Sequence, residues 1–275
     1  TSILVNNWFM MYFLSVVLIG TVYPIFLDVI SSQKISVGPP FYHKLIAPFL
    51  IPFLFAMAIG PRLKWIRSDL KDKIYLISLL IISILISFFI VKNFSTNILI
   101  NTILISSALY LFFITLRDFF SKKYKNFAQN TAHFGFSLLI LSILFNNLFS
   151  SEIITNLKVG ETYDNSKTKI VFESINQKKE KNYKSIIANF NITNSEGINN
   201  NLSPELRIYN QPNITTSEAD IKTTLMKDKF IVINLVQNQD YFNVRYQVKP
   251  FMLWIWLSVI MISLGGLVSF LQKRI

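Results

Sequence analysis

Six long apolar segments constrain the fold of this chain more than any other feature of its sequence. They cover residues 8–27, 45–60, 74–91, 98–116, 130–149 and 251–271. Each segment has about 16–21 residues, close to the ~20 residues that an α-helix needs to cross the hydrocarbon core of a bilayer. A segment inside lipid must satisfy its backbone hydrogen bonds internally, which an α-helix does. The sequence therefore predicts a polytopic α-helical membrane protein with about six transmembrane helices.

The composition agrees with a membrane environment and excludes several chemistries. The 275 residues are 52% hydrophobic and only 15% charged, whereas soluble domains are roughly 25% charged. The chain has no cysteine. Disulfide bonds, thiolate metal sites and thiol nucleophiles are therefore excluded.

The chain has a net charge of +12, and the distribution of its basic residues among the loops predicts its orientation in the membrane. Most of the loop Lys and Arg residues lie in two alternate short loops and at the C-terminus, namely Arg62, Lys64, Arg67, Lys71, Lys73, Arg117, Lys122, Lys123, Lys125, Lys273 and Arg274. The other short loops carry only Lys34, Lys44 and Lys92. Because basic loops stay in the cytoplasm, we expect both termini there. Residues 152–249 contain 13 positive and 11 negative side chains, so no nucleic-acid partner is expected.

The chain is predicted to have three parts. Residues 1–149 form a membrane domain of five transmembrane helices, residues 150–249 a small β-rich extracytoplasmic domain, and residues 250–275 a C-terminal transmembrane helix with a cytoplasmic tail. About 100 residues are enough for a small domain. Its hydrophobic period is two, since Val244, Tyr246 and Val248 alternate with polar residues, which is typical of half-buried strands.

Local patterns predict further details of the β-rich domain. Residues 230–236 are β-branched and aromatic and favour a strand, with a turn at Asn238-Gln239-Asp240. Ser217 followed by Asp220 resembles a helix-capping pair, which favours a short helix as far as Leu225. The polar stretches 177–184 and 194–201 are expected to be loops.

His133, near the start of the fifth apolar segment, is the most informative residue for function. A titratable side chain inside a membrane helix is energetically costly and by default marks a functional site. Neutral imidazole also suits a haem iron as an axial ligand. The alternative is a structural histidine that hydrogen-bonds a neighbouring helix or the headgroup region.

The neighbours of His133 leave both interpretations open. At helical spacing, Phe136, Ser137 and Ile140 share its face. The small residues Ala132 and Gly135 would allow a flat macrocycle to approach, but they also allow ordinary helix–helix contact.

Other polar and aromatic residues have simpler interpretations. His43 is expected at the membrane surface, and Asp28 near the headgroups. Trp254 and Trp256 favour an interfacial aromatic belt, with haem contact as the alternative. The sequence contains no phosphate-binding loop, carboxylate pair, Ser-His-Asp arrangement or metal-ligand cluster, and it identifies no catalytic residue.

Four stretches form an ordered set of motifs. They are GTVYP at 20–24 with ISVGPPFY at 35–42, AHFG at 132–135, TTSEADIKTTL at 215–225 with Asp228, and KP at 249–250 with WIWL at 254–257 and GGL at 265–267. In this order they resemble the C-terminal part of CcmF, the membrane haem lyase component of the cytochrome c maturation system. The resemblance covers nearly the whole chain.

The resemblance implies a role in attaching haem to cytochromes. CcmF-like proteins take haem from the haem chaperone CcmE and join its vinyl groups by thioether bonds to apocytochrome c, which a CcmH-type protein presents. The family also holds a b haem within the membrane, and His133 matches one of its axial ligands. The implied cofactor is haem b, with His133 as a ligand of the haem iron. The implied location is the bacterial inner membrane, with the mitochondrial inner membrane as the alternative, and the β domain is expected in the periplasm.

The departures from the family are equally specific. The Trp-rich haem-handling segment, two flanking extracytoplasmic histidines and the second membrane ligand would lie upstream of Thr1. We therefore expect this chain to be the C-terminal piece, a fragment or part of a split protein, that works with an upstream CcmF segment. The resemblance implies part of a cytochrome c haem lyase complex, in which this chain alone lacks the Trp-rich haem-handling segment.

Two other functions fit the residues. The chain could be a non-catalytic membrane scaffold whose β domain docks a partner protein and whose His133 only packs. It could also be a transporter, because Pro48 and Pro52 interrupt the second segment. No internal repeat or pair of broken helices supports transport.

Overall fold

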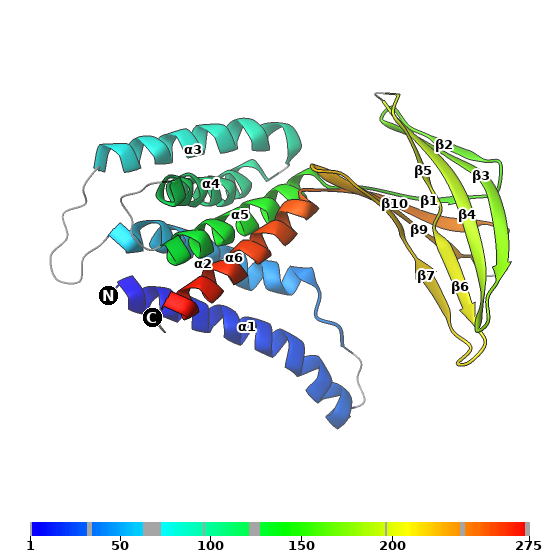
Figure 1. Ribbon diagram of the computed structural model, residues 1–275, viewed down its shortest axis with the longest axis horizontal. Helices are drawn as coiled ribbons and strands as arrows, with labels where there is room; N and C mark the ends of the chain where they lie inside the picture. Colours follow the sequence, from blue (N-terminus) through cyan, green and yellow to red (C-terminus); the bar gives the residue numbers. More distant parts are fainter. Residues whose placement is uncertain are drawn as a thin grey trace. The chain divides into compact units, whose positions relative to one another are not determined.

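The computed structural model describes residues 2–31, 35–62, 73–95, 97–120, 127–195, 197–236 and 240–272 (Figure 1). The chain forms two compact units. Residues 1–144 and 257–275 form the helical unit, and residues 145–256 form the sandwich unit. Most of the basic loop residues that predict the orientation, and residues 238–239 of the predicted turn, lie outside the described residues.

Within the described residues, six helices are each long and apolar enough to cross a membrane. They are α1 (Ser2–Ser31), α2 (Pro39–Ile59), α3 (Lys73–Phe94), α4 (Ile98–Phe120), α5 (Phe127–Phe149) and α6 (Met252–Gln272), and a short 3₁₀ helix, η1 (Gly60–Arg62), follows α2. The predicted fold class, a helical membrane protein with a β-rich domain, is confirmed.

Local chemistry explains how polar residues are accommodated in these helices. The Ser83 hydroxyl donates to the Leu79 carbonyl oxygen at 2.8 Å, and the Ser15 hydroxyl to that of Met11 at 2.9 Å. Such bonds hide a hydroxyl that lipid could not solvate. Helix α2 begins with Pro39 and Pro40 in its first turn, where the missing N–H of proline would have no helical partner anyway.

The interior of the helical unit lies around α4. Leu111 and Ile114 of α4 are fully buried, as is Leu54 of α2, and α4 packs against both α2 and α3. Helices α5 and α6 pack through small residues. A Cβ atom added at Gly135 would lie 3.0 Å from the Ser258 carbonyl oxygen of α6. This close approach is the usual way in which membrane helices associate.

The described residues of the sandwich unit form two antiparallel sheets. One sheet has the order β1 (Ser151–Leu157), β10 (Phe242–Pro250), β9 (Lys227–Leu235) and β8 (Asp220–Thr223). The other has the order β2 (Thr162–Asp164), β3 (Thr168–Lys179), β4 (Tyr183–Asn194), β6 (Glu205–Tyr209) and β7 (Thr215–Glu218), and β5 (Asn199–Leu202) also pairs with β4.

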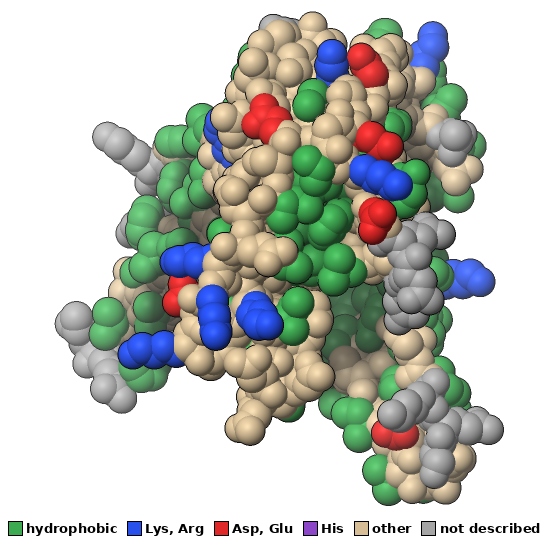
Figure 2. Space-filling model, turned by 90° about the vertical axis from the view of Figure 1, so that its right-hand side faces the viewer, with side chains coloured by type: hydrophobic (Ala, Val, Ile, Leu, Met, Phe, Trp, Pro, Cys, Tyr) green, Lys and Arg blue, Asp and Glu red, His purple; other side chains and the backbone are tan. Residues whose placement is uncertain are grey.

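The inward side chains of both sheets form one hydrophobic core. The Phe172 and Phe190 rings stack with centroids 4.4 Å apart, and both are buried. The predicted alternation along β10 is confirmed from Val244 to Tyr246, which are buried on either side of the exposed Arg245. It does not continue, because Gln247 is buried as well and Val248 is only half-buried. Outside the core, Figure 2 shows Lys and Arg side chains interspersed with Asp and Glu, as the near balance of charge in this region predicts.

The predicted helix that ends at Leu225 is wrong. Residues 215–218 form β7 in one sheet and residues 220–223 form β8 in the other, so the chain passes between the sheets at Ala219. Ser217 does not cap a helix; its hydroxyl donates to the side-chain oxygen of Asn234 at 2.5 Å. The Asp220 carboxylate instead accepts a bond from the Ser203 backbone N–H at 2.6 Å.

The two predicted loops are also wrong in part. Strands β3 and β4 pair as far as Lys179 opposite Lys184, which leaves only a short hairpin turn. Residues 199–202 form β5. Apart from the buried Asn200, the described side chains of residues 177–184 and 194–201 reach water, which explains their polarity without a lack of backbone pairing.

The links between strands and membrane helices are tightly held within the sandwich unit. The Asn146 side-chain amide, at the end of α5, donates to the Pro250 carbonyl oxygen at 2.5 Å. The backbone of Phe251 has a φ angle of 61°, a left-handed conformation that residues other than glycine rarely adopt. Its ring lies against Phe145, with centroids 5.6 Å apart. These contacts hold the strained backbone at the start of α6.

Candidate functional site around His133

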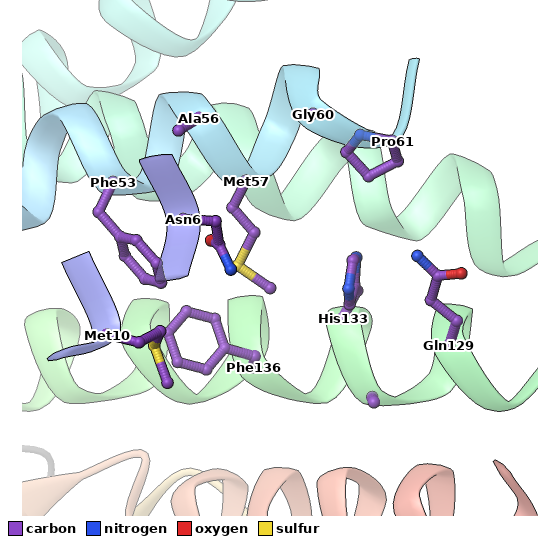
Figure 3. A pocket seen from close by; sticks show the side chains of 11 residues that line it. Asn6, Met10, Phe53, Ala56, Met57, Gly60, Pro61, Gln129, His133 and Phe136 are labelled. Atoms are coloured by element: carbon purple, nitrogen blue, oxygen red, sulfur yellow. The ribbon is translucent and has the colours of Figure 1, made fainter. Parts of the chain in front are cut away.

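Helix α5 presents a different side to each of its neighbours. The Ser137 hydroxyl is buried and lies 2.7 Å from the Thr115 hydroxyl of α4. Gly135 faces α6 at close range. The side chains of His133 and Phe136 point toward α1 and α2, as Figure 3 shows. The predicted shared face of His133 and Phe136 is therefore present, whereas Ser137 packs on another helix.

Two clefts meet at His133. The first has a volume of about 550 Å³ and is lined by Asn6, Met10, Phe53, Ala56, Met57, Gly60, Pro61, Gln129, Ala132, His133 and Phe136. The second has a volume of about 510 Å³ and is lined by Ala128, Gln129, Ala132, His133, Gly265, Gly266, Ser269 and Gln272. Volumes of this size are typical of sites for small molecules and cofactors. His133 is the titratable residue common to both clefts.

The walls of the first cleft are mainly apolar. Phe53, Met57, Met10 and Phe136 surround one end, and the His133 imidazole rises from α5 toward the end of α2 at Gly60 and Pro61 (Figure 3). Polar groups come from the amides of Asn6 and Gln129. A flat hydrophobic molecule with one ligating centre would match these walls.

The His133 imidazole is not committed to a structural hydrogen bond. Its residue is only partly buried, and none of the residues that the structure describes forms a hydrogen bond with it. A bond from His133 to a neighbouring helix is therefore not found among the described residues, and the alternative of a bond to the headgroup region stays a prediction. An imidazole nitrogen remains available to a molecule in the clefts.

Among the residues that the structure describes at the clefts, His133 is the one histidine. The other histidine, His43, lies exposed in the first turns of α2. Among the described residues, no group of three or more His, Cys, Asp or Glu side chains could hold a metal ion. The donor set thus fits a cofactor that brings its own equatorial ligands and needs only an axial imidazole.

An ion pair between Arg62 and Asp118 connects helices near the first cleft. Arg62, which directly follows Pro61 of the cleft, donates to both carboxylate oxygens of Asp118 at 2.8 and 2.9 Å. It also donates to the Ala58 carbonyl oxygen at 3.0 Å. The Asn130 side chain donates to the Asp118 backbone carbonyl oxygen at 3.0 Å. The ends of α2 and α4 and the start of α5 are thereby joined beside His133.

Sequence reasoning missed this ion pair. In the sequence, Arg62 is a marker of orientation only, and Asp118 belongs to no motif. Nothing in the local sequence pairs residues 56 positions apart. The only available signal was an acidic residue at the end of an otherwise apolar segment.

The structure also separates the alternatives for the small residues and the tryptophans. The space beside Gly135 is filled by α6, so close helix packing, rather than room for a macrocycle, explains the glycine at this position. Ala132 contacts Gly265 of α6 and also lines both clefts. Trp254 donates its indole N–H to the Leu225 carbonyl oxygen at 3.0 Å, which agrees with an interfacial role.

Comparisons with known proteins match both parts of the chain. Residues 148–250 match the family described as CcmF C-terminal beta-sandwich. The cytochrome c-type biogenesis protein CcmF of Pseudomonas fluorescens is 25% identical over 291 residues, which cover 100% of this chain and 44% of that protein. The protein of the same name from Escherichia coli (strain K12) is 24% identical over 281 residues, or 99% of this chain and 43% of the relative.

The fold has a counterpart among solved structures. A cytochrome c haem lyase CcmF superimposes with a TM-score of 0.73 at 18% sequence identity, over 97% of this chain and 44% of the other. The predicted resemblance to the C-terminal part of CcmF is confirmed. This chain spans less than half the length of the relatives that it matches.

Proposed function

Because the chain is similar over its whole length to the C-terminal part of CcmF, a cytochrome c-type biogenesis protein, we propose that it forms the C-terminal part of a cytochrome c maturation haem lyase. In this role it holds a b haem in the membrane through His133 and helps to attach haem to apocytochrome c by thioether bonds. The observation that carries the proposal is the imidazole of His133, which lies where two clefts meet and forms no hydrogen bond with the residues that the structure describes.

The residues around His133 fit a haem group. Neutral imidazole binds haem iron without adding charge to the membrane interior. Phe53, Met57 and Phe136 offer apolar surface for a macrocycle. A b haem bound at this site supplies one-electron redox chemistry inside the membrane. The protein holds the His133 imidazole at a fixed position on α5, and its apolar side chains exclude water from the cleft.

The ion pair of Arg62 and Asp118 supports the site indirectly. Both side chains are largely buried, and their mutual hydrogen bonds satisfy charges that the membrane could not solvate. By joining α2 to α4 beside Pro61, the pair holds the wall of the first cleft opposite His133. We therefore assign Arg62 a positioning role rather than a ligand role.

The second axial ligand and the haem-handling surface come from a companion segment in this proposal. The chain spans 44% of its relatives, and the described residues offer no other histidine at the clefts. The upstream CcmF segment would supply these parts. The haem chaperone CcmE, a CcmH-type protein and apocytochrome c are the proposed further partners.

The proposed location is the bacterial inner membrane. The basic residues that the structure describes at the ends of helices, Arg62, Lys73 and Arg117, lie on the predicted cytoplasmic side. The sandwich unit then lies in the periplasm, where apocytochrome c receives its haem. Docking of a partner is its proposed task.

Optical spectroscopy of histidine variants tests the proposal. The chain is co-expressed with its upstream segment and purified as wild type, His133→Ala and His43→Ala. The wild type is expected to show a reduced spectrum of low-spin bis-histidine b haem, which His133→Ala loses or converts to a high-spin form. The exposed His43 is the matched control, and its variant should keep the wild-type spectrum.

Two results would contradict the assignment. If the purified wild type contains no haem, the proposal of a haem b cofactor is wrong. If the spectrum of His133→Ala is unchanged, His133 is not a haem ligand. Either result would favour the alternative function, a non-catalytic membrane scaffold whose sandwich docks a partner.

A further inference from the structure

The turn between β8 and β9 exposes two large apolar side chains. Leu225 is 61% exposed and Met226 is 54% exposed. Ile221, on β8, is also exposed. None of these three side chains belongs to the core of the sandwich. Turns normally carry small or polar residues, so adjacent Leu and Met at a turn point to a surface that water does not cover.

Two hydrogen bonds tie this turn to the beginning of α6. The Phe251 backbone N–H donates to the Met226 carbonyl oxygen at 2.8 Å. The Trp254 indole N–H donates to the Leu225 carbonyl oxygen at 3.0 Å. All four residues lie within the sandwich unit. The height of the turn relative to the first turn of α6 is therefore well defined.

The first turns of α6 have the composition of a membrane interface. Helix α6 can cross a membrane, and its first turns contain Trp254 and Trp256. Trp256 is 63% exposed. Tryptophan is enriched where a membrane segment enters the headgroup region, because its ring is apolar and its N–H needs a polar partner. A turn bonded to Trp254 lies at the same depth.

We propose that Leu225 and Met226 insert into the interface between lipid headgroups and acyl chains beside α6. The turn then acts as a second attachment of the sandwich to the lipid surface, next to the covalent link through Phe251. Its apolar side chains face lipid, while its carbonyl oxygens are bonded by the protein and need no water. This inference is independent of haem binding at His133.

The absence of cysteine from the chain allows a direct measurement. Leu225→Cys and Met226→Cys are each labelled with an environment-sensitive fluorophore in the full chain, reconstituted in phosphatidylcholine vesicles. Quenching is compared between a lipid with a nitroxide near the headgroup and aqueous iodide.

Val159→Cys is the matched control. Val159 is also an exposed apolar residue beside a turn. It follows β1, whose first residue, Ser151, comes directly after α5. A seven-residue strand moves the chain by roughly 20 Å, so Val159 lies far along the strand from the helix end.

The nitroxide lipid is expected to quench labels at positions 225 and 226 several-fold more strongly than a label at 159, and iodide should show the reverse order. Iodide quenching at 225 and 226 equal to that at 159 would place the turn in water and overturn the inference. Protection of both labels from both quenchers would show that protein covers the turn, which also overturns it.

Discussion

The sandwich unit and the helical unit use the same kinds of side chain in opposite places. In the sandwich, Phe172 and Phe190 are buried in the core. In helix α3, Phe89 is 68% exposed while Ser83 and Ser87 are fully buried. The sandwich must hide apolar groups from water, whereas lipid solvates them and leaves small residues to make the close helix contacts. The pattern of burial thus reports the solvent of each unit.

The largest expected effect tests this difference directly. Phe172→Ala should destabilise the sandwich by about 3–5 kcal/mol, because it removes buried surface and leaves a cavity. Phe89→Ala, on a lipid-facing surface, should change stability by no more than about 0.5 kcal/mol. Thermal unfolding of both variants in detergent or lipid provides the measurement. Similar losses in the two variants would contradict the assignment of different solvents.

Buried and exposed ion pairs sharpen the same comparison. Arg62→Ala leaves Asp118 as an unpaired, largely buried charge and should cost about 3–5 kcal/mol. Arg245→Ala is the control, because Arg245 pairs with Glu152 on the exposed surface of the sandwich and should have a small effect. If the pair is structural, adding Asp118→Ala to Arg62→Ala should restore part of the lost stability. A double variant as unstable as the sum of both single variants would argue against pairing.

Two adjacent glycines test the packing of α5 on α6. A Cβ atom at Gly265 would lie 2.7 Å from the backbone nitrogen of Ala132, so Gly265→Ala should cost about 1–3 kcal/mol. A Cβ atom at Gly266 meets nothing within 4 Å, and Gly266→Ala should be tolerated. Equal melting temperatures for the two variants would refute this packing. Because both glycines line the second cleft, haem retention is a useful second measurement.

The smallest effect concerns Tyr246 in the sandwich core. Its hydroxyl is buried without a hydrogen-bond partner among the described residues, and burial raises the pKa of its phenol to about 12. Below the ordinary pKa of 10 the phenol is neutral in both states and stability does not depend on its ionisation. Between pH 10 and 12 the unfolded chain ionises its phenol while the folded chain does not, so stability falls as the pH rises through this range. Tyr246→Phe should be neutral or stabilising by about 1 kcal/mol near pH 7, and it should reduce the loss of stability between pH 10 and 12. Unfolding measured across that range would show whether the loss persists in the variant.

The sequence predicted the helices and strands that depend on the composition and spacing of neighbouring residues. The six apolar helices follow from segment length and composition, and strands such as β10 follow from alternation with a period of two. The predicted helix near Ser217 failed because its polar residues resemble a cap, while pairing with β6 and β9, distant in sequence, decided the outcome. Tertiary pairing commonly overrides weak local signals.

The candidate site divides in the same way. The sequence alone determined that His133 is the histidine within the apolar segments, that thiol chemistry is absent, and that the chain resembles the C-terminal part of CcmF. Only the tertiary structure decided that two clefts meet at His133, that Gly135 serves α6, and that Arg62 pairs with Asp118. The physical reason is distance along the chain: composition and spacing act within one element, whereas a cleft or a buried ion pair exists only where separate helices meet.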